Sequence, residues 1–150
     1  MVLLKNIGQR IIACFASTIL LMLNGCQSFQ TSPTSLYDDL GGQQGLAKIV
    51  DQLIIEKSLK PTVEAHFKDS NMDRFKIKLV EQLCVLSDGN CNYTGDTMVD
   101  VHTGMKIKES EFNALVEALI NAMNNVGIAN TTQNRLLAIL AKLRPEVINI

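Results

Sequence analysis

Apolar residues recur every three or four positions along most of the chain after residue 35, which is the period of an α-helix that buries one face. The clearest run places Leu46, Ile49, Val50, Leu53 and Ile54 at i, i+3, i+4, i+7 and i+8. Later runs carry Met72, Phe75, Leu79, Leu83 and Leu86, then Leu115, Val116, Leu119 and Met123, and finally Leu136, Leu137 and Leu140. No alternating strand pattern competes with these runs, so the predicted fold class is all-α.

Capping residues and breakers set the expected ends of these helices. Ser35 and Asp38 resemble a capping box before a short helix that Gly41 and Gly42 stop, and Ser70 with Asp73 opens a later helix. The other expected boundaries are Pro61 after the first long helix, 88–89 after the second, 112–126 for the third, and about 131 to 143 for the last, with Pro145 just beyond it.

The first 25 residues are typical of an export signal rather than of the fold. Lys5 and Arg10 form a short basic region, and the apolar run 11–23 has thirteen residues, fewer than the ~20 that span a bilayer. The run ends in Leu-Asn-Gly-Cys at 23–26, which resembles a bacterial lipobox with Cys26 as the lipidated mature N-terminus. The alternative is an uncleaved N-terminal anchor. Both interpretations predict an exported chain attached to a bacterial membrane, facing the periplasm or the cell surface.

The remaining composition indicates one weakly acidic domain. Loss of residues 1–25 removes Lys5 and Arg10 but no acidic residue, so the 14 basic and 15 acidic side chains become 12 and 15, a net charge of −3. No basic patch favours a nucleic-acid partner. Residues 26–35 are polar, contain Pro33 and are expected to form a flexible tether, which leaves 36–150 for one core.

Two cysteines remain in that domain, Cys84 and Cys91. Their separation of seven positions is compatible with a disulfide that closes a small loop, worth roughly 2–3 kcal/mol in the chain-entropy model. Two free buried thiols are the alternative. A Cys/His zinc site is the weaker interpretation, because zinc sites usually contain closely spaced cysteine pairs.

The segment 88–108 is long for a connection in a compact domain, and such connections tend to be functional. It holds His102, one of two histidines in the chain, beside Tyr93, Met98 and Met105. An imidazole that binds a metal through one nitrogen and donates from the other is the chemistry this residue offers. On spacing alone, a satisfied histidine that caps a helix is the favoured explanation.

Several short motifs follow one another across residues 36–147. They are Leu-Tyr-Asp-Asp-Leu-Gly-Gly at 36–42, Ala-His-Phe at 65–67, Asn-Met at 71–72, Tyr-Thr-Gly at 93–95 leading to Met98, His-Thr-Gly-Met-Lys-Ile at 102–107, Glu-Phe at 111–112 and Leu-Arg-Pro-Glu at 143–146. Their order and spacing resemble the group 1 truncated haemoglobins. The resemblance implies a two-over-two helical sandwich around haem b, and an oxygen-binding or other gas-binding function.

Position by position, the resemblance implies that His102 is the proximal axial ligand of the haem iron. It places Phe67 on the haem face, and Arg74 and Lys78 near the haem propionates. The other implied haem contacts are Phe75, Leu79, Met98, Val101, Ile107, Phe112, Leu115 and Leu119. Cys84 and Cys91 are similar to a cysteine pair in some exported relatives. The alternative for each apolar contact is an ordinary core side chain, and for Arg74 and Lys78 a solvated one.

The distal side departs from the family pattern. Many members have a tyrosine and two glutamines that donate hydrogen bonds to bound oxygen; at those positions this chain has Ile54, Phe75 and Leu79. The predicted distal pocket is therefore apolar, which favours rapid oxygen release and good binding of carbon monoxide and nitric oxide. Lys78 is the polar residue that can reach the sixth coordination position, and His66 is expected to point away from it.

Three functions follow from these expectations. The leading one is a lipid-anchored haem protein that reversibly binds O2, CO or NO. The second is an enzyme of the nitric oxide dioxygenase type, which needs an electron donor and a stable complex with oxygen. The third is a haem-free helical interaction lipoprotein.

Overall fold

The structure is a computed structural model that describes residues 34–148 and 150. The predicted signal segment, Cys26 and most of the predicted tether lie outside the described residues. The folded unit begins at Thr34. Ser35, the last residue of the expected tether, is the N-cap of the first described helix as its capping pattern predicted, and its hydroxyl oxygen accepts the Asp38 N–H at 3.0 Å.

The regular elements of the described part of the chain are all helices, as predicted. Its elements are α2 (Leu36–Asp39), α3 (Gly42–Ser58), α4 (Pro61–Glu64), the 3-10 turn η2 (Ala65–Phe67), α5 (Met72–Leu86), α6 (Met98–His102), α7 (Glu109–Asn125), α8 (Asn130–Leu140) and the 3-10 turn η3 (Ala141–Glu146). The only β-pairing among these residues is one isolated parallel bridge between Ile107 and Ile148. None of the described helices is both long and apolar enough to cross a membrane.

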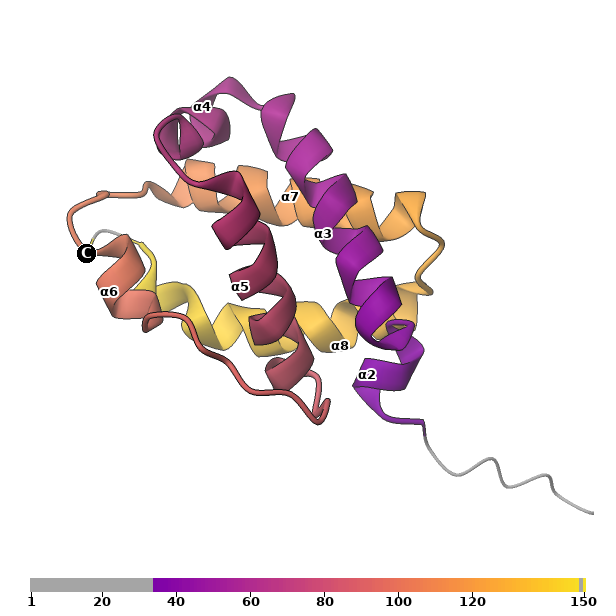
Figure 1. Ribbon diagram of the computed structural model, residues 1–150. Helices are drawn as coiled ribbons and strands as arrows, with labels where there is room; N and C mark the ends of the chain where they lie inside the picture. Colours follow the sequence, from indigo (N-terminus) through magenta and orange to yellow (C-terminus); the bar gives the residue numbers. More distant parts are fainter. Residues whose placement is uncertain (1–33, 149) are drawn as a thin grey trace, which may run out of the picture. The chain divides into compact units, whose positions relative to one another are not determined.

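The four long helices form two layers. Figure 1 shows α3 and α5 in front of α7 and α8, with the two pairs crossing. The helix α3 packs against both α5 and α7, so it is central to the fold. The short helix α6 lies at the end of the layers where α8 passes into η3 (Figure 1).

The core consists of the apolar faces that the helical period predicts. Its fully or nearly fully buried members include Leu46, Ile49, Val50 and Leu53 of α3, Val80, Leu83 and Cys84 of α5, Ala118, Leu119, Ala122 and Met123 of α7, and Leu136 of α8. Burial of one such aliphatic side chain stabilises the fold by roughly 1.5–3 kcal/mol. The predicted inward residues Ile54, Leu137 and Leu140 are only partly buried against this core.

The turn from α2 into α3 depends on glycine. Gly41 adopts a φ of 86°, which side chains with a Cβ rarely adopt. Gly45 lies so close to the preceding turn that an added Cβ would be 2.0 Å from the Leu40 carbonyl oxygen. Backbone conformation therefore favours glycine at position 41, and close packing against the preceding turn requires it at position 45.

Three predicted helix ends are wrong. The N-cap of α5 is Asn71 rather than Ser70, because the Asn71 side-chain oxygen accepts the Arg74 N–H at 3.0 Å. Helix α7 begins three residues before Phe112, where the Glu111 carboxylate accepts the Lys108 N–H at 2.8 Å. Helix α8 ends at Leu140, and the chain then tightens into η3, which contains Pro145.

The long segment 88–108 is not wholly irregular, because it contains α6. Thr97 caps this helix: its hydroxyl oxygen accepts the Asp100 N–H at 3.1 Å and its hydroxyl donates to the Asp100 carboxylate. At the other end of the segment, Cys91 is joined by a disulfide to Cys84 near the end of α5. Disulfide sulfurs are not thiolate ligands, so the zinc interpretation loses both cysteines.

Candidate functional site

A cavity of about 460 Å³ lies between α5, α6 and α7 and extends to η3. Its volume is within the range of roughly 300–1,000 Å³ that is usual for small-molecule sites, and its lining is mainly apolar. A shallower hollow of about 580 Å³ opens on the surface beside α4 and shares only Phe67 and Ser70 with the cavity. The more enclosed of the two, the apolar cavity, is the candidate site, because it brings together the residues that the sequence singled out.

His102 is the last residue of α6 and lines the cavity half-buried. Its Nδ1 atom lies 2.7 Å from the backbone carbonyl oxygen of Met98, one helical turn earlier. A carbonyl oxygen can only accept, so this hydrogen bond requires a proton on Nδ1. The Nε2 atom then carries the lone pair, which is the tautomer that a metal-binding histidine needs.

Aromatic and aliphatic side chains form the wall supplied by η2 and α5. The rings of Phe67 and Phe75 pack edge to face with centroids 4.9 Å apart, and Leu79 lies one turn after Phe75. Neither Phe75 nor Leu79 can donate a hydrogen bond into the cavity.

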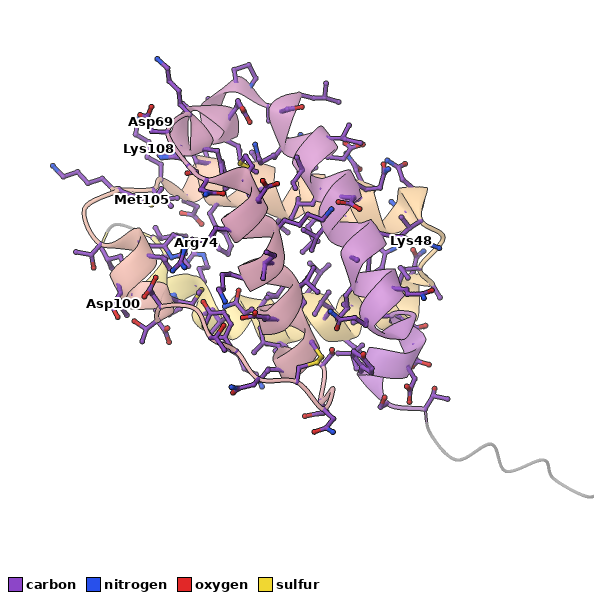
Figure 2. All side chains as sticks on the ribbon, viewed as in Figure 1. Lys48, Asp69, Arg74, Asp100, Met105 and Lys108 are labelled. Atoms are coloured by element: carbon purple, nitrogen blue, oxygen red, sulfur yellow. A yellow bond between two sulfur atoms is a disulfide. The ribbon has the colours of Figure 1, made fainter. Side chains whose placement is uncertain are left out.

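Basic side chains at the cavity edge are held by acidic partners. Arg74 pairs with Asp96 at 3.0 Å, and Figure 2 shows Arg74 on α5 on the side of α6. Lys78 donates to Glu81 at 3.0 Å and also contacts the Thr94 hydroxyl. The pKa of Glu81 is lowered, first by the hydrogen bond from the Thr94 N–H and next by Lys78.

Tyr93 contributes the phenol of the predicted Tyr-Thr-Gly stretch to the same edge. Its hydroxyl donates to the Asp96 backbone oxygen at 2.7 Å. Burial, followed by the charges of Asp96 and Glu81, raises the Tyr93 pKa, so the phenol stays protonated at neutral pH. Tyr93 therefore acts as a neutral donor that shapes the segment leading to α6.

The structure places all twelve residues predicted to contact a cofactor in the cavity lining. They are Phe67, Arg74, Phe75, Lys78, Leu79, Met98, Val101, His102, Ile107, Phe112, Leu115 and Leu119. The predicted distal residue Ile54 is not among the lining residues; the adjacent Leu53 is. A helix rotates by about 100° per residue, so these neighbours face different directions.

Two polar lining residues were missed or misplaced by sequence reasoning. His66, which was expected to point away, lines the cavity with its Nε2 atom buried, 3.3 Å from a Glu111 oxygen but without hydrogen-bond geometry. Gln82 also lines the cavity, and its amide nitrogen lies 3.0 Å from the Met98 sulfur. The sequence could have predicted Gln82 as a lining residue, because it follows Lys78 by four positions and so lies on the same face of the helix.

Residues 35–149 match the family model of the bacterial-like globins. A group 1 truncated hemoglobin from Mycolicibacterium paratuberculosis is 30% identical over 118 residues, which cover 79% of this chain and 87% of that protein. This chain belongs to the group 1 truncated haemoglobins. A relative from Tetrahymena pyriformis is 23% identical to this globin over 116 residues, or 77% of it and 96% of the relative.

Solved structures confirm the fold of this globin. The truncated hemoglobin of Tetrahymena pyriformis in its Fe(III) form has a TM-score of 0.75 at 22% identity and covers 78% of this chain and 100% of its own. The 2/2 hemoglobin of a Synechococcus species has a TM-score of 0.71 at 18% identity, with 77% and 98% covered. The predicted two-over-two sandwich is therefore correct.

As a globin, the protein has haem b as its cofactor, and gas binding is the general function of the family. The site fits this cofactor on its own chemistry. It offers an apolar cavity, a histidine in the ligand tautomer and cations at the edge, which suit a flat macrocycle with two carboxylates. Among the residues that the structure describes, no group of three or more His, Cys, Asp or Glu side chains could hold a bare metal ion.

Proposed function

We propose that this globin binds haem b through His102 Nε2 and uses it for the reversible binding of O2, CO and NO. The observation that carries the proposal is the hydrogen bond between His102 Nδ1 and the Met98 carbonyl oxygen, which leaves the Nε2 lone pair of this cavity-lining residue available for a metal. When bound, haem supplies an iron centre that takes a diatomic gas as a ligand. The protein's part is to hold and orient the macrocycle, exclude water and set the polarity around the gas.

The polarity of the opposite wall supports rapid release of oxygen. Phe75 and Leu79 offer no hydrogen-bond donor, and the ammonium group of Lys78 is bound to Glu81. A missing hydrogen bond to a polarised ligand costs about 1–3 kcal/mol. Carbon monoxide and nitric oxide depend less on such a donor, so we expect them to bind well. Storage, sensing and scavenging of these gases all fit this site.

The visible spectrum of the haem-supplied full chain tests the proposal. We expect a Soret band that shifts with dithionite and again with carbon monoxide, and that His102→Ala abolishes or strongly alters. His66→Ala is the matched control, because it removes the other lining histidine and leaves the spectrum close to that of the unmodified chain. Absence of a Soret band, or a band that His102→Ala leaves unchanged, would overturn the proposal.

We further propose that the chain is exported and attached to a membrane by lipid at Cys26. The support is the basic region, the apolar run 11–23 and the lipobox-like residues before Cys26, which all lie outside the described residues. Cells expressing the full chain are fractionated after growth with labelled fatty acid. We expect label in the membrane fraction, and Cys26→Ala to remove it. A labelled Cys26→Ala protein, or an unlabelled soluble parent, would refute this localisation.

A further inference from the structure

Lys57 is a buried charge that the site described above does not use. Its exposed fraction is 2%, and within the described residues it is the only charged side chain among those classed as buried. It follows Leu53 by four positions on α3, so it occupies the core-facing row of Leu46, Val50 and Leu53. The helical period expects an apolar residue there, and burial of an ammonium group is costly unless it has partners.

Two partners hold the Lys57 ammonium group. Its Nζ atom lies 2.5 Å from a carboxylate oxygen of Glu64 and 4.5 Å from the centre of the Phe67 ring, over the ring. Glu64 is partly exposed, with 45% of its side chain accessible, so water screens its charge more than that of Lys57. The pair therefore leaves a net positive field in the buried region around Phe67.

That field reaches the cavity through one side chain. Phe67 lines the cavity, whereas Lys57 does not. The ammonium group is thus one aromatic ring removed from the space that the cofactor occupies. Electrostatic effects at this range are large in a protein interior because little water intervenes. Arg74 and Lys78 at the edge are also paired with acidic residues, but they are more accessible to water than Lys57.

We propose that Lys57 is an electrostatic tuning residue of this globin, whose buried charge favours ferrous over ferric haem and strengthens the binding of anionic ligands to the ferric form. This inference rests on the proposed haem binding. Ferric haem carries one more positive charge than ferrous haem, so a nearby fixed cation disfavours oxidation. An anionic ligand reduces the charge of the ferric centre and gains from the same cation. Lys57 thereby supplies, by charge, some of the polarity that Phe75 and Leu79 lack.

A structural role alone makes a different prediction. If Lys57 only ties the end of α3 to α4, its loss and the loss of Glu64 break the same ion pair and have effects of the same kind. If the charge acts on the site, removal of the cation and removal of the anion have opposite effects. The sign of the change therefore distinguishes the two explanations.

The test uses the haem-loaded full chain and four variants. Lys57→Met removes the charge at similar length, Lys57→Arg keeps it, and Glu64→Gln removes the counter-charge. Lys48→Met is the matched control, because Lys48 is an exposed lysine on the same helix, labelled in Figure 2. The measurements are the midpoint potential by spectroelectrochemical titration, and the affinities of the ferric form for azide, an anion, and for neutral imidazole.

We expect Lys57→Met to lower the midpoint potential and to weaken azide several-fold more than imidazole. Glu64→Gln should raise the potential and strengthen azide, while Lys57→Arg and Lys48→Met stay near the parent values. If Lys57→Met loses its helical circular dichroism, and therefore does not fold, the result for Glu64→Gln tests the inference alone, because that variant keeps the lysine. Unchanged potentials, or shifts of the same sign in Lys57→Met and Glu64→Gln, would overturn the inference. A parent chain without a Soret band would instead overturn the proposed haem binding.

Discussion

The two histidines of the cavity differ in what their ring nitrogens can do. His102 has its Nδ1 atom fixed by the Met98 carbonyl oxygen of its own helix, so its other nitrogen is free to bind a metal. His66 has its buried Nε2 atom beside Glu111, without a hydrogen bond. The hydrogen bond from His102 Nδ1 to the Met98 carbonyl oxygen therefore distinguishes the candidate ligand His102 from His66.

Leu79 is the position at which the polarity of the distal wall can be restored. We expect Leu79→Gln to slow oxygen dissociation about 10- to 100-fold, because one donor to a polarised ligand is worth about 1–3 kcal/mol. Stopped-flow displacement of oxygen by carbon monoxide measures the rate. Ile77→Gln is the control, since Ile77 lies two residues earlier on α5 with 55% of its surface exposed. An unchanged rate in Leu79→Gln would mean that this position does not face the ligand.

Lys78 is held away from a coordinating role by its partners. Its ammonium group is bound to Glu81 and Thr94, whereas only a neutral amine can coordinate iron. We expect Glu81→Gln to increase the six-coordinate fraction of the ferric protein. Absorption and electron paramagnetic resonance spectra report this fraction. The double variant Lys78→Ala, Glu81→Gln should lose the increase; a signal that persists there would exclude Lys78 as the ligand.

The residues that the sequence predicted well are those whose position depends on spacing along regular helices. The interval from Phe67 to His102 spans a long helix and a tightly tied segment, so family-like order was enough to bring these two residues to one cavity. The prediction that Ile54 lines the pocket was wrong, because consecutive residues of α3 face different directions and Leu53, not Ile54, lines the cavity. Lys57 could not be predicted as buried, since its burial depends on Glu64 and Phe67, which come from other elements.

At the scale of elements, the segment after α5 is tied back along that helix at three levels. Cys91 is bonded to Cys84, Thr94 donates from its N–H to Glu81 at 3.0 Å, and Asp96 pairs with Arg74. The order along the segment is the reverse of that along α5, so residues 91–96 run back beside the helix. Thr97 then begins α6, which ends at His102. Sequence reasoning missed α6 because five residues are too few to show a helical period.

The disulfide is the tie that lies farthest along the segment from His102. We expect its loss to make the segment that leads to His102 more mobile. Reduction or Cys84→Ala with Cys91→Ala should cost about 2–3 kcal/mol of unfolding free energy and lower the melting temperature by on the order of 10 °C. Haem transfer to an excess of apomyoglobin should become faster. Circular dichroism and absorbance follow the two changes.

A phosphine reductant applied to the double alanine variant separates the crosslink from other effects of the reagent. That variant has no disulfide to reduce, so its melting temperature and haem transfer rate should not respond. Equal responses in the parent and the variant would contradict a role for the crosslink.

At the scale of the whole molecule, three carboxylates with lowered pKa values join elements that are distant in sequence. The pKa of Asp39 on α2 is lowered by the Thr34 hydroxyl and then by Arg135 of α8. The pKa of Glu81 is lowered by the segment after α5, and that of Glu111 by the Lys108 N–H and then by His66 of η2. These residues connect both layers and the cavity edge, so their ionisation couples the fold to pH.

The sign of that coupling follows from the direction of the shifts. Because the pKa of each group is lower in the folded chain than in the unfolded chain, the unfolded state binds more protons in acid. The resulting stabilisation is fully present above the unfolded pKa values, 3.8 for Asp39 and 4.5 for Glu81 and Glu111, and is lost as the pH falls through the lowered folded values. The triple variant Asp39→Asn, Glu81→Gln, Glu111→Gln should melt lower than the parent at pH 7 but lose less between pH 6 and pH 3, so that the two curves converge in acid. Melting temperatures of both chains across this range measure the effect. Parallel curves for the parent and the triple variant would show that other groups carry the acid response, because only groups whose protonation differs between the two states can change the slope.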